Sequence, residues 1–481
     1  MICISLTAQT NRELLKLLDQ ASGEPGDVHE IRMDDIREPV AVEELVAAST
    51  RPVVACCRSR QGSGKFDGQA AERRDLLTRA ARAGAAYIDA ETVDVPYLAN
   101  VVKPAILMAS VYDSAGTPDS LVSLVRDLAT LPADWIKFSV THRRPVDSVR
   151  VFKALRAAPK PCVGNAMGDG GLMTRVLGLA YGSKMVYASL EPGYESAPGQ
   201  PTARDYAKVY RVKKLTPETP VYGLLGNPVA HSRSFRLHNR AFAKLGLDAV
   251  YIPFRTESAE EFLDAIPPVI NLCGLSVTLP HKPAALRWAE YASESAQRIG
   301  TANTLTRTGK GWRADNTDCA GAFESIKDAI VDARMNLTGA DALVLGAGGT
   351  TRAVGLALTL LGCHVSVAAR NPEQAWRAAS QMDWEVEEWE EAPHGNWRVV
   401  ANTTPVGMYP DLDETPFPAS CWKKGMLAFD AVHNPQETRF LRDAAAAGAL
   451  TVDGVEMFLR QAQEQFRMWT GMAMPKISSL T

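Results

Sequence analysis

The chain has 481 residues, of which 46% are hydrophobic, so it is long enough for two or three domains with separate cores. Its 52 basic and 55 acidic residues nearly balance, which argues against a nucleic-acid or anionic-membrane binding surface. Small-molecule chemistry is the class of function that remains.

The cysteine, histidine and hydropathy patterns favour a cytoplasmic protein without a metal site. The eight cysteines lack CxxC and CxxH spacing, which is typical of reduced core thiols, and the eight histidines form no HExxH or HxH pairs. No stretch approaches the ~20 apolar residues of a membrane span. The opening MICISLTAQT has no signal-peptide pattern.

Eight short apolar runs in residues 1–214 alternate with segments of helical periodicity, which predicts βα units and a parallel sheet. The runs begin at Ile2, Val28, Pro52, Ala85, Pro104, Asp134, Pro161 and Lys184. Eight such units predict an α/β fold of the (β/α)8 TIM-barrel type, compact beside the usual ~250 residues. An open doubly wound sheet is the alternative.

Charged residues on these predicted strands indicate a candidate site, because chemistry in this fold occurs at the carboxyl ends of the strands. Glu30 and Arg32 are two residues apart and should point to the same side, and Arg58 follows the third strand. Lys137 lies within DWIKFSV, whose apolar residues should desolvate its ammonium and lower its pKa, as a Schiff-base lysine requires. Alternatively, Lys137 faces the helices and extends to water.

The segment RVKKLTPETPVYG, from Arg211, has basic residues and two prolines and predicts a linker. After it we expect an α/β domain over residues 220–330, completed by a carboxyl-terminal helix over residues 455–475. A Rossmann-type nucleotide-binding domain is expected over residues 336–450.

Three polar clusters in the expected α/β domain begin at Gly226, Gly274 and Ile299. Each places hydroxyl or amide groups beside glycines at the end of a strand, which suits a substrate rich in hydroxyls. Lys282 and Asp318 within these clusters offer a cation and an anion for one proton network.

The predicted strand ALVL, from Ala342, leads into a glycine turn at residues 346–349 and then a helical run. This pattern predicts a pyrophosphate site at a helix amino terminus, although a turn without a ligand has the same pattern. The next strand, HVSVAAR, ends in Arg370 instead of an acidic residue, which favours NADP over NAD unless Arg370 is simply solvated. The later segments ANTTPVGM and FDAVHNP are expected to enclose the nicotinamide.

Residues 220–475 resemble shikimate dehydrogenase, because HSRS, VTLPHK, ANTL, NTD, GAGG, NTTPVGM and GVEMFLRQA occur in that order. The resemblance implies NADPH-dependent reduction of 3-dehydroshikimate to shikimate, with Lys282 as the catalytic residue paired with Asp318. The substrate-binding residues it implies are Ser232, Ser234, Thr278, Lys282, Asn303, Asp318 and Gln461. The cofactor-binding residues expected are Gly346, Ala347, Gly348, Gly349, Thr350, Arg370, Met408, Val432 and Gly454. A tyrosine is usual in that family where this chain has His433.

Residues 1–210 resemble type I 3-dehydroquinate dehydratase, most clearly in EIRMD, DWIKFSV, MGDGGLMTRVLG and SAPGQPT. The resemblance implies dehydration of 3-dehydroquinate to 3-dehydroshikimate through an imine on Lys137. The substrate-binding residues it implies are Glu30, Arg32, Arg58, Arg175, Ser196 and Gln200. Because the product of the first reaction is the substrate of the second, the chain resembles the bifunctional enzymes that combine both steps in aromatic amino acid biosynthesis.

The barrel departs from the dehydratase pattern at the acid/base pair. Gly62 stands where that family has a glutamate, and Tyr112 stands where it has a histidine. Dehydration needs a base and an acid beside the imine. Either Tyr112 or His142 replaces the missing groups, or the barrel has become a binding or scaffolding domain.

Two other functions are open for the second half of the chain. A quinate dehydrogenase would recognise the same carboxylate and hydroxyls. A non-enzymatic regulator would use the same groups to sense the metabolite, although the Lys282/Asp318 pair argues against it.

Overall fold

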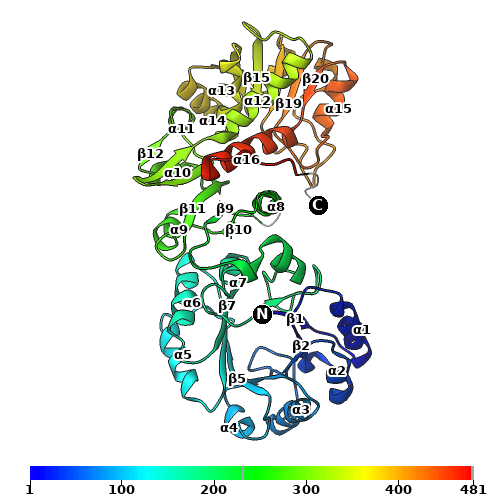
Figure 1. The fold of residues 1–481 in the computed structure, drawn as a ribbon. Coiled ribbons are helices and arrows are strands. Elements are labelled where there is room, and N and C mark those ends of the chain that lie inside the picture. The colour runs from blue at the N-terminus through cyan, green and yellow to red at the C-terminus, as the bar shows by residue number, and fades with distance from the viewer. Residues whose placement is uncertain (230–231, 478–481) are drawn as a thin grey trace. The chain divides into compact units, whose positions relative to one another are not determined.

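The computed structural model of the protein describes residues 1–229 and 232–477, drawn in Figure 1. Its contacts divide the chain into two compact units, Met1–Leu272 with Ile477 and Cys273–Lys476, each with hydrophobic clusters of its own. Within the described residues, no helix is long and apolar enough to cross a membrane.

The first unit begins with eight parallel strands, as the apolar runs predicted. They are β1 (Ile2–Leu6), β2 (Val28–Arg32), β3 (Val53–Cys56), β4 (Tyr87–Glu91), β5 (Ile106–Tyr112), β6 (Trp135–Thr141), β7 (Cys162–Met167) and β8 (Val186–Ala188). The strands pair in the order β7-β6-β5-β4-β3-β2-β1-β8, and a parallel bridge between Cys162 and Ser183 joins the two end segments. The prediction of a (β/α)8 barrel is therefore confirmed, and the open-sheet alternative is wrong.

Helices surround these strands, as Figure 1 shows. They are α1 (Asn11–Ser22), α2 (Val42–Ala48), α3 (Ala70–Arg82), α4 (Val95–Leu98), α5 (Leu121–Thr130), α6 (Pro145–Ala157) and α7 (Leu172–Val176). The longer ones are amphipathic and bury leucines, valines and alanines on one side. Two 3₁₀ turns, Met33–Asp35 and Asp169–Gly171, follow β2 and β7, and a π-helical turn covers Asp205–Val209.

The barrel interior has an apolar layer and a polar layer because successive side chains on a strand alternate in direction. Cys3 and Val28 belong to the apolar cluster. Two residues further along the same strands, Ser5 and Glu30 are register partners, so they face the same interior nearer the carboxyl ends of the strands. The polar layer therefore lies on the carboxyl side of the apolar one, where the fold places chemistry.

The first unit also contains a parallel pair of strands after the barrel. Its elements are β9 (Val221–Gly226), α8 (Ser234–Lys244), β10 (Val250–Arg255) and α9 (Ala259–Ala265). An ion pair between Arg144 at the start of α6 and Glu261 in α9 links this segment to the barrel.

The second unit opens with a mixed sheet. Its strands are β11 (Leu272–Val277), β12 (Tyr291–Ala292), β13 (Thr304–Thr308) and β14 (Gly311–Asp315); its helices are α10 (Lys282–Trp288), α11 (Glu294–Ile299) and α12 (Thr317–Asp332). Strand β13 runs antiparallel to both β11 and β14. The start of β13 therefore lies beside the end of β11.

A six-stranded parallel sheet follows, in the order β17-β16-β15-β18-β19-β20. The strands are β15 (Asp341–Leu345), β16 (His364–Ala368), β17 (Glu385–Val386), β18 (Val399–Asn402), β19 (Leu427–Asp430) and β20 (Leu450–Val452). The helices are α13 (Gly349–Leu360), α14 (Pro372–Met382), α15 (Arg439–Ala446) and α16 (Gly454–Thr470). The strand order reverses at β15, whose neighbours are β16 and β18, which is the ligand-binding point of a Rossmann-type sheet.

Close packing between β6 and β7 generates a stability prediction. A Cβ atom on Gly164 would lie 2.2 Å from Cζ of the fully buried Phe138 ring. We expect Gly164→Ala to destabilise the barrel by about 1–3 kcal/mol through overpacking. Hydrogen exchange in peptides from β6 and β7 measures the change. Gly23→Ala is the matched control, because the nearest atom to its added Cβ is 3.8 Å away; equal protection in both variants would contradict the prediction.

Candidate active sites

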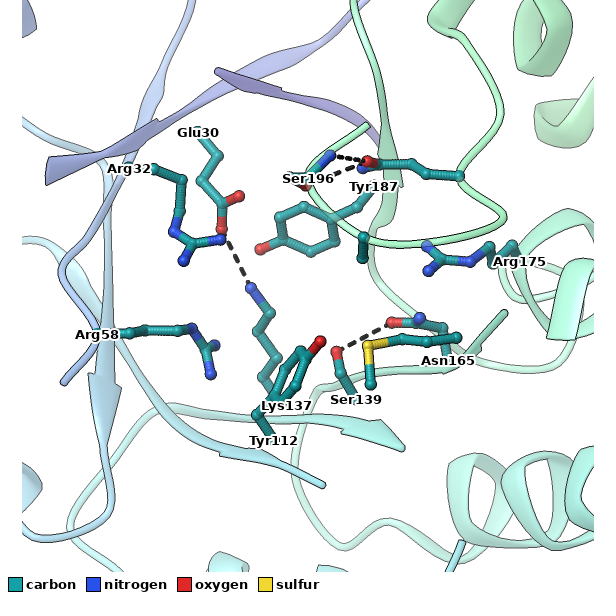
Figure 2. A pocket seen from close by; sticks show the side chains of 13 residues that line it. Glu30, Arg32, Arg58, Tyr112, Lys137, Ser139, Asn165, Arg175, Tyr187 and Ser196 are labelled. Carbon is teal, nitrogen blue, oxygen red and sulfur yellow. Dashed lines mark hydrogen bonds and ion pairs between the residues drawn. The ribbon is translucent and has the colours of Figure 1, made fainter. Parts of the chain in front are cut away.

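A polar pocket lies in the barrel, and Figure 2 shows the side chains that line it. It contains every barrel residue selected from the sequence except His142, together with five residues that the sequence interpretation did not select. The lining residues are Glu30, Arg32, Arg58, Tyr112, Lys137, Ser139, Asn165, Met167, Arg175, Tyr187, Ser196, Ala197 and Gln200.

Lys137 lies inside this pocket between two buried carboxylates. Its ammonium is 2.6 Å from Oδ2 of Asp89 on β4 and 3.2 Å from Oε1 of Glu30 on β2. The three residues are only 5%, 1% and 3% exposed, respectively. The alternative of a lysine that faces the helices and extends to water is therefore wrong.

The expected lowering of the Lys137 pKa is also wrong. Burial acts in the expected direction, but the negative charges of Asp89 and Glu30 outweigh it and raise the pKa above its usual value. In turn, the positive charges of Arg58 and Lys137 overcome the burial of Asp89 and lower the pKa of that carboxyl. Lys137 is thus a charged ammonium at neutral pH and must lose a proton before it can attack a carbonyl.

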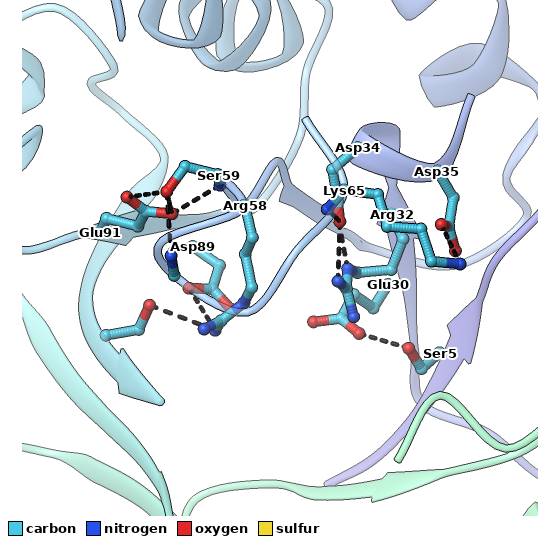
Figure 3. Close-up of polar contacts among 12 residues, drawn as sticks. Ser5, Glu30, Arg32, Asp34, Asp35, Arg58, Ser59, Lys65, Asp89 and Glu91 are labelled. Carbon is cyan, nitrogen blue, oxygen red and sulfur yellow. Dashed lines mark hydrogen bonds and ion pairs between the residues drawn. The ribbon is translucent and has the colours of Figure 1, made fainter. Parts of the chain in front are cut away.

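The two arginines near Lys137 are held by carboxylates, as Figure 3 shows. Arg58 donates to Asp89 at 3.1 Å, and Arg32 donates to Asp34 through two nitrogens at 3.0 and 2.9 Å. The backbone N–H of Lys65 also donates to Asp34. These contacts position both guanidinium groups and hold the loop after β3 against the 3₁₀ turn after β2.

A carboxylate occupies the space beside Gly62, the position where the dehydratase family has a glutamate. It belongs to Glu91 at the end of β4, whose Oε1 would lie 2.2 Å from a Cβ on Gly62. Glu91 accepts hydrogen bonds from the N–H and hydroxyl of Ser59, as Figure 3 shows. It also pairs with Arg73 at 3.2 Å. It is not among the pocket-lining residues, so it anchors the loop.

The two acid/base candidates from the sequence have different positions. Tyr112 ends β5 and lines the pocket, with the Arg58 guanidinium 5.7 Å from its ring centroid. His142 follows β6 and packs against Gly170 outside the lining, where burial lowers its pKa. Its odd spacing from Lys137 agrees with this position, because residues an odd number apart on a strand point to opposite sides. His142 is therefore not a pocket residue.

The opposite side of the pocket carries Arg175 and the segment after β8. The Arg175 guanidinium is 2% exposed and donates to the carbonyl of Pro198 at 3.3 Å, which leaves its Nε without a described partner. Gln200 accepts from the N–H and hydroxyl of Ser196. A buried arginine with an unused donor suits a carboxylate ligand.

The carboxylates of Glu30 and Asp89 and the Cys56 thiol also satisfy the spacing of a metal site, since their ligand atoms lie within 4.8 Å of one another. The Lys137 ammonium, however, already contacts both carboxylates. Burial and the charge of Asp89 raise the pKa of the Cys56 thiol, which keeps it protonated and a poor ligand. The cation in this cluster is the lysine.

The second unit brings Lys282 and Asp318 together, as the proton-network hypothesis requires. Lys282 begins α10, Asp318 lies in the first turn of α12, and their Nζ and Oδ2 atoms are 2.5 Å apart. Asn303 donates to the other oxygen of Asp318 at 2.7 Å. The Lys282 and Asp318 side chains are 14% and 13% exposed, so the pair is sheltered but accessible.

The position of Asn303 differs from the expectation that each polar cluster ends a strand. Asn303 precedes β13, and its carbonyl accepts from the N–H of Val277, the last residue of β11. Because β13 is antiparallel to β11, the start of β13 and the end of β11 meet at one edge of the sheet. Thr278 follows β11 directly, and Gln461 on α16 lies 3.5 Å from the Thr317 hydroxyl.

Ser232 and Ser234 lie in the first unit at the start of α8. The Ser232 hydroxyl is 3.1 Å from the Ser234 hydroxyl and accepts from the Ser234 N–H. Helix α8 has 11 residues, so free N–H groups and two hydroxyls occur together at its amino end. The first residue of the HSRS segment, His231, lies outside the described residues.

The glycine turn between β15 and α13 has the geometry of a pyrophosphate site. Gly346 has φ +128°, and a Cβ there would lie 2.6 Å from the Thr403 hydroxyl. Gly348 is the N-cap of α13, and a Cβ on it would meet no atom of the described residues within 4 Å, which leaves the helix amino terminus open to a ligand. Gly349 contributes the first N–H of the helix, beside Ala347 and Thr350 in the turn.

The remaining expected cofactor residues follow the neighbouring strands. Arg370 is exposed two residues after β16, and no ion pair involves it within the described chain. Met408 follows β18 and is 44% exposed, whereas Val432 follows β19 and is buried. A Cβ on Gly454 would collide with the Val432 carbonyl, so α16 begins against that strand end. The His433 ring stacks on Phe458, with centroids 5.5 Å apart.

The sequence interpretation missed several residues that organise these sites. Asp89 could have been noticed as an acidic residue inside the apolar run AAYIDA, but its pairing with Lys137 depends on strand order. Gln465 contacts Ser276, Asn303 and Thr304, and Asp430 accepts from Asn402, Val432 and Thr438. Burial raises the pKa of Asp430 to about 6. The fourth missed feature is Tyr187, an aromatic residue of a barrel strand.

The chain contains a parallel barrel with a buried lysine in a polar pocket. A Rossmann-type unit with a glycine turn and a lysine–aspartate pair follows. These features define an enzyme with two chemically different sites. Residues 2–217 match the type I 3-dehydroquinase family, residues 224–305 the shikimate dehydrogenase substrate binding domain, and residues 454–476 the shikimate 5'-dehydrogenase C-terminal domain. A relative is the bifunctional 3-dehydroquinate dehydratase/shikimate dehydrogenase of Arabidopsis thaliana chloroplasts, which is 32% identical to this chain. The similarity covers 99% of this chain and 83% of the relative. The chain belongs to this bifunctional family.

Its second half has separate relatives. A shikimate dehydrogenase (NADP(+)) of Bacillus licheniformis is 36% identical over 52% of this chain and 92% of its own length. The solved structure of shikimate dehydrogenase from Aquifex aeolicus is 32% identical, with a TM-score of 0.50 over 54% of this chain and 96% of its own.

The raised pKa of Lys137 generates a labelling prediction. Cyanate carbamylates only neutral amines, so labelling of Lys137 should accelerate as pH rises toward its pKa. Asp89→Asn removes the nearer carboxylate and should lower that pKa by one unit or more, giving at least about tenfold faster labelling at neutral pH. Peptide mass spectrometry measures the rate. Asp134→Asn, which removes the surface partner of Lys103, is the control; equal rates in the two variants would refute the electrostatic account.

Proposed function

We propose that the chain catalyses two consecutive steps of the shikimate pathway, with the barrel dehydrating 3-dehydroquinate to 3-dehydroshikimate and the second half reducing that product to shikimate with NADPH. The observation that carries the proposal is the similarity to a bifunctional relative over 99% of the chain, with a lysine-centred polar pocket in the dehydratase half. The working domains are residues 1–214, residues 220–330 completed by residues 455–475, and residues 336–450.

In the barrel, Lys137 attacks the ring ketone and forms the imine. Its proton first passes to one of the carboxylates that hold it, since both accept hydrogen bonds from the ammonium. Arg175 pairs with the substrate carboxylate through its free donor. The residues that hold hydroxyl groups or close the site are Glu30, Arg32, Arg58, Ser196 and Gln200.

In the dehydrogenase half, Ser232 and Ser234 bind the substrate carboxylate, and Thr278, Asn303 and Gln461 hold ring hydroxyls. Lys282 donates a hydrogen bond to the reacting oxygen, while Asp318 orients the ammonium and takes part in proton transfer. The contact from Asn303 fixes the Asp318 carboxylate for this role.

The residues at the glycine turn fit a dinucleotide, because an open helix amino terminus follows the strand at which the sheet order reverses. Residues 346–350 would hold the pyrophosphate, Arg370 the 2′-phosphate of NADP, and Met408, Val432 and Gly454 the nicotinamide side. The bound cofactor supplies the hydride that reduces the ketone.

A coupled assay tests both halves at once. The unaltered chain should oxidise NADPH when supplied with 3-dehydroquinate. Lys137→Ala should lose this activity but still reduce 3-dehydroshikimate, and Lys282→Ala should lose about 10²–10⁴-fold of the reduction while retaining NADP binding. A mixture of the two variants should restore flux from 3-dehydroquinate.

The controls for this assay are Lys153→Ala and Lys327→Ala, which alter exposed lysines on α6 and α12. Reduction of 3-dehydroshikimate without any turnover of 3-dehydroquinate would defeat the dehydratase proposal and leave the dehydrogenase. Oxidation of quinate in preference to shikimate would replace the dehydrogenase proposal with a quinate dehydrogenase.

The choice of NADP has its own test. Arg370→Ala removes the cation expected at the 2′-phosphate and should raise KM for NADPH by about 10–100-fold, the loss of one charge-assisted hydrogen bond. The KM for NADH should change little. Arg377→Ala, which removes an exposed arginine paired with Glu373 on α14, is the control. An unchanged KM for NADPH would remove Arg370 from the cofactor site.

A further inference from the structure

One hydroxyl group in the barrel pocket has no assigned role. Tyr187 lies on β8, is 8% exposed and lines the pocket. Its hydroxyl oxygen is buried and has no hydrogen-bond partner among the described residues. Figure 2 shows this hydroxyl directed toward the side of the pocket that holds Glu30 and Lys137. An unsatisfied buried hydroxyl is costly, so a ligand that accepts from it would be favoured.

The position of Tyr187 relative to Lys137 limits which substrate atom its hydroxyl can reach. The Lys137 Nζ atom lies over the face of the tyrosine ring, 3.9 Å from the ring centroid. The phenol oxygen extends beyond the ring edge and is displaced sideways from Nζ. This leaves room for the hydroxyl to contact a substrate atom other than the imine nitrogen.

The Tyr187 hydroxyl keeps its proton in the folded protein. Burial raises the pKa of Tyr187 well above its usual value, and the negative charge of Glu30 acts in the same direction. The group is thus a donor at physiological pH. Glu30 is the one carboxylate among the pocket-lining residues and already accepts from Ser5 and Lys137. The pocket therefore contains a hydrogen-bond donor and a proton acceptor near the imine-forming lysine.

We propose that Tyr187 is the catalytic proton donor of the barrel, giving its hydroxyl proton to the hydroxyl that the substrate loses during dehydration. The inference rests on the dehydratase function proposed above. It supplies an acid to a site in which Gly62 replaces the family glutamate and His142 lies outside the pocket lining.

The elimination proceeds through an enamine. The carbon beside the imine carbon loses a proton to Glu30, and its electron pair forms an enamine. That pair then moves to form the ring double bond as the C–O bond one carbon further breaks. The departing oxygen takes the Tyr187 proton and leaves as water, while the iminium is restored. The proton on Glu30 returns to the phenolate, and hydrolysis of the iminium frees Lys137.

Electrostatics favour proton transfer from Tyr187 to the departing oxygen while the C–O bond breaks. Positive charge returns to the nitrogen of Lys137 as the C–O bond breaks, and that nitrogen lies over the face of the same tyrosine ring. A cation above the ring stabilises the phenolate that forms beneath it. The cation over the Tyr112 ring is the Arg58 guanidinium, 5.7 Å from the ring centroid, and not the nitrogen on which charge returns; the Tyr112 side chain is also only half-buried.

Tyr187→Phe tests the proposal because it removes only the hydroxyl. In the full chain with 3-dehydroquinate and borohydride, the variant should still form a Lys137 adduct, which also shows that the pocket is folded. Dehydration should fall by about 10²–10⁴-fold. The trapped adduct should retain the mass of the water that the unaltered chain eliminates, so mass spectrometry separates imine formation from the acid-assisted step.

Tyr87→Phe is the matched control, because Tyr87 begins β4 and its hydroxyl contacts Met1 instead of the pocket. Normal dehydration by Tyr187→Phe would overturn the inference alone, as would a loss of dehydration confined to Tyr112→Phe with the adduct intact. If the unaltered chain formed no adduct and no 3-dehydroshikimate, the proposed dehydratase function would fail as well.

Discussion

The buried contact of Lys137 with Asp89 and Glu30 determines much of the rest of the barrel site. Each of the three residues comes from a different strand, so the contact exists only when β2, β4 and β6 have their correct register. A lone buried ammonium would be neutralised or would destabilise the fold. Two carboxylates keep it charged, and Arg58 then compensates the second negative charge. The arginine positions and the protonation state of the nucleophile follow from this arrangement.

The sequence was sufficient to predict the strands of the barrel and some of the residues that line its pocket. Apolar runs locate all eight strands, because a parallel barrel strand is buried on both faces. The spacing of Glu30 and Arg32 places both on the pocket side. The direction of the Lys137 pKa could not be predicted in the same way, because local apolar neighbours indicate desolvation but not the charges that other strands contribute. Asp89 is 48 residues away in the chain.

The dehydrogenase half shows a different limit of sequence interpretation. Its motifs identify Lys282, Asp318 and Asn303, and these side chains do meet. The motifs do not reveal strand direction, so Asn303 was expected to end a strand, whereas it precedes the antiparallel β13. Tyr187 escaped notice for a related reason, because an aromatic residue in a strand is usually part of a core. Only the folded barrel shows that its hydroxyl has no hydrogen-bond partner among residues 1–229 and 232–477. The cytoplasmic location stays a prediction.

The carboxylate of Glu91 beside Gly62 has an evolutionary consequence. In this chain the space next to residue 62 is filled from β4, and Ser59 and Arg73 hold the carboxylate there. A glutamate introduced at position 62 would therefore meet an occupied site of the same charge. The effect of that single substitution depends on the residue at position 91, a case of epistasis between a loop and a strand. A glutamate at position 62 would therefore be better tolerated together with a change at position 91, and another acid or base within the barrel would meet no such conflict.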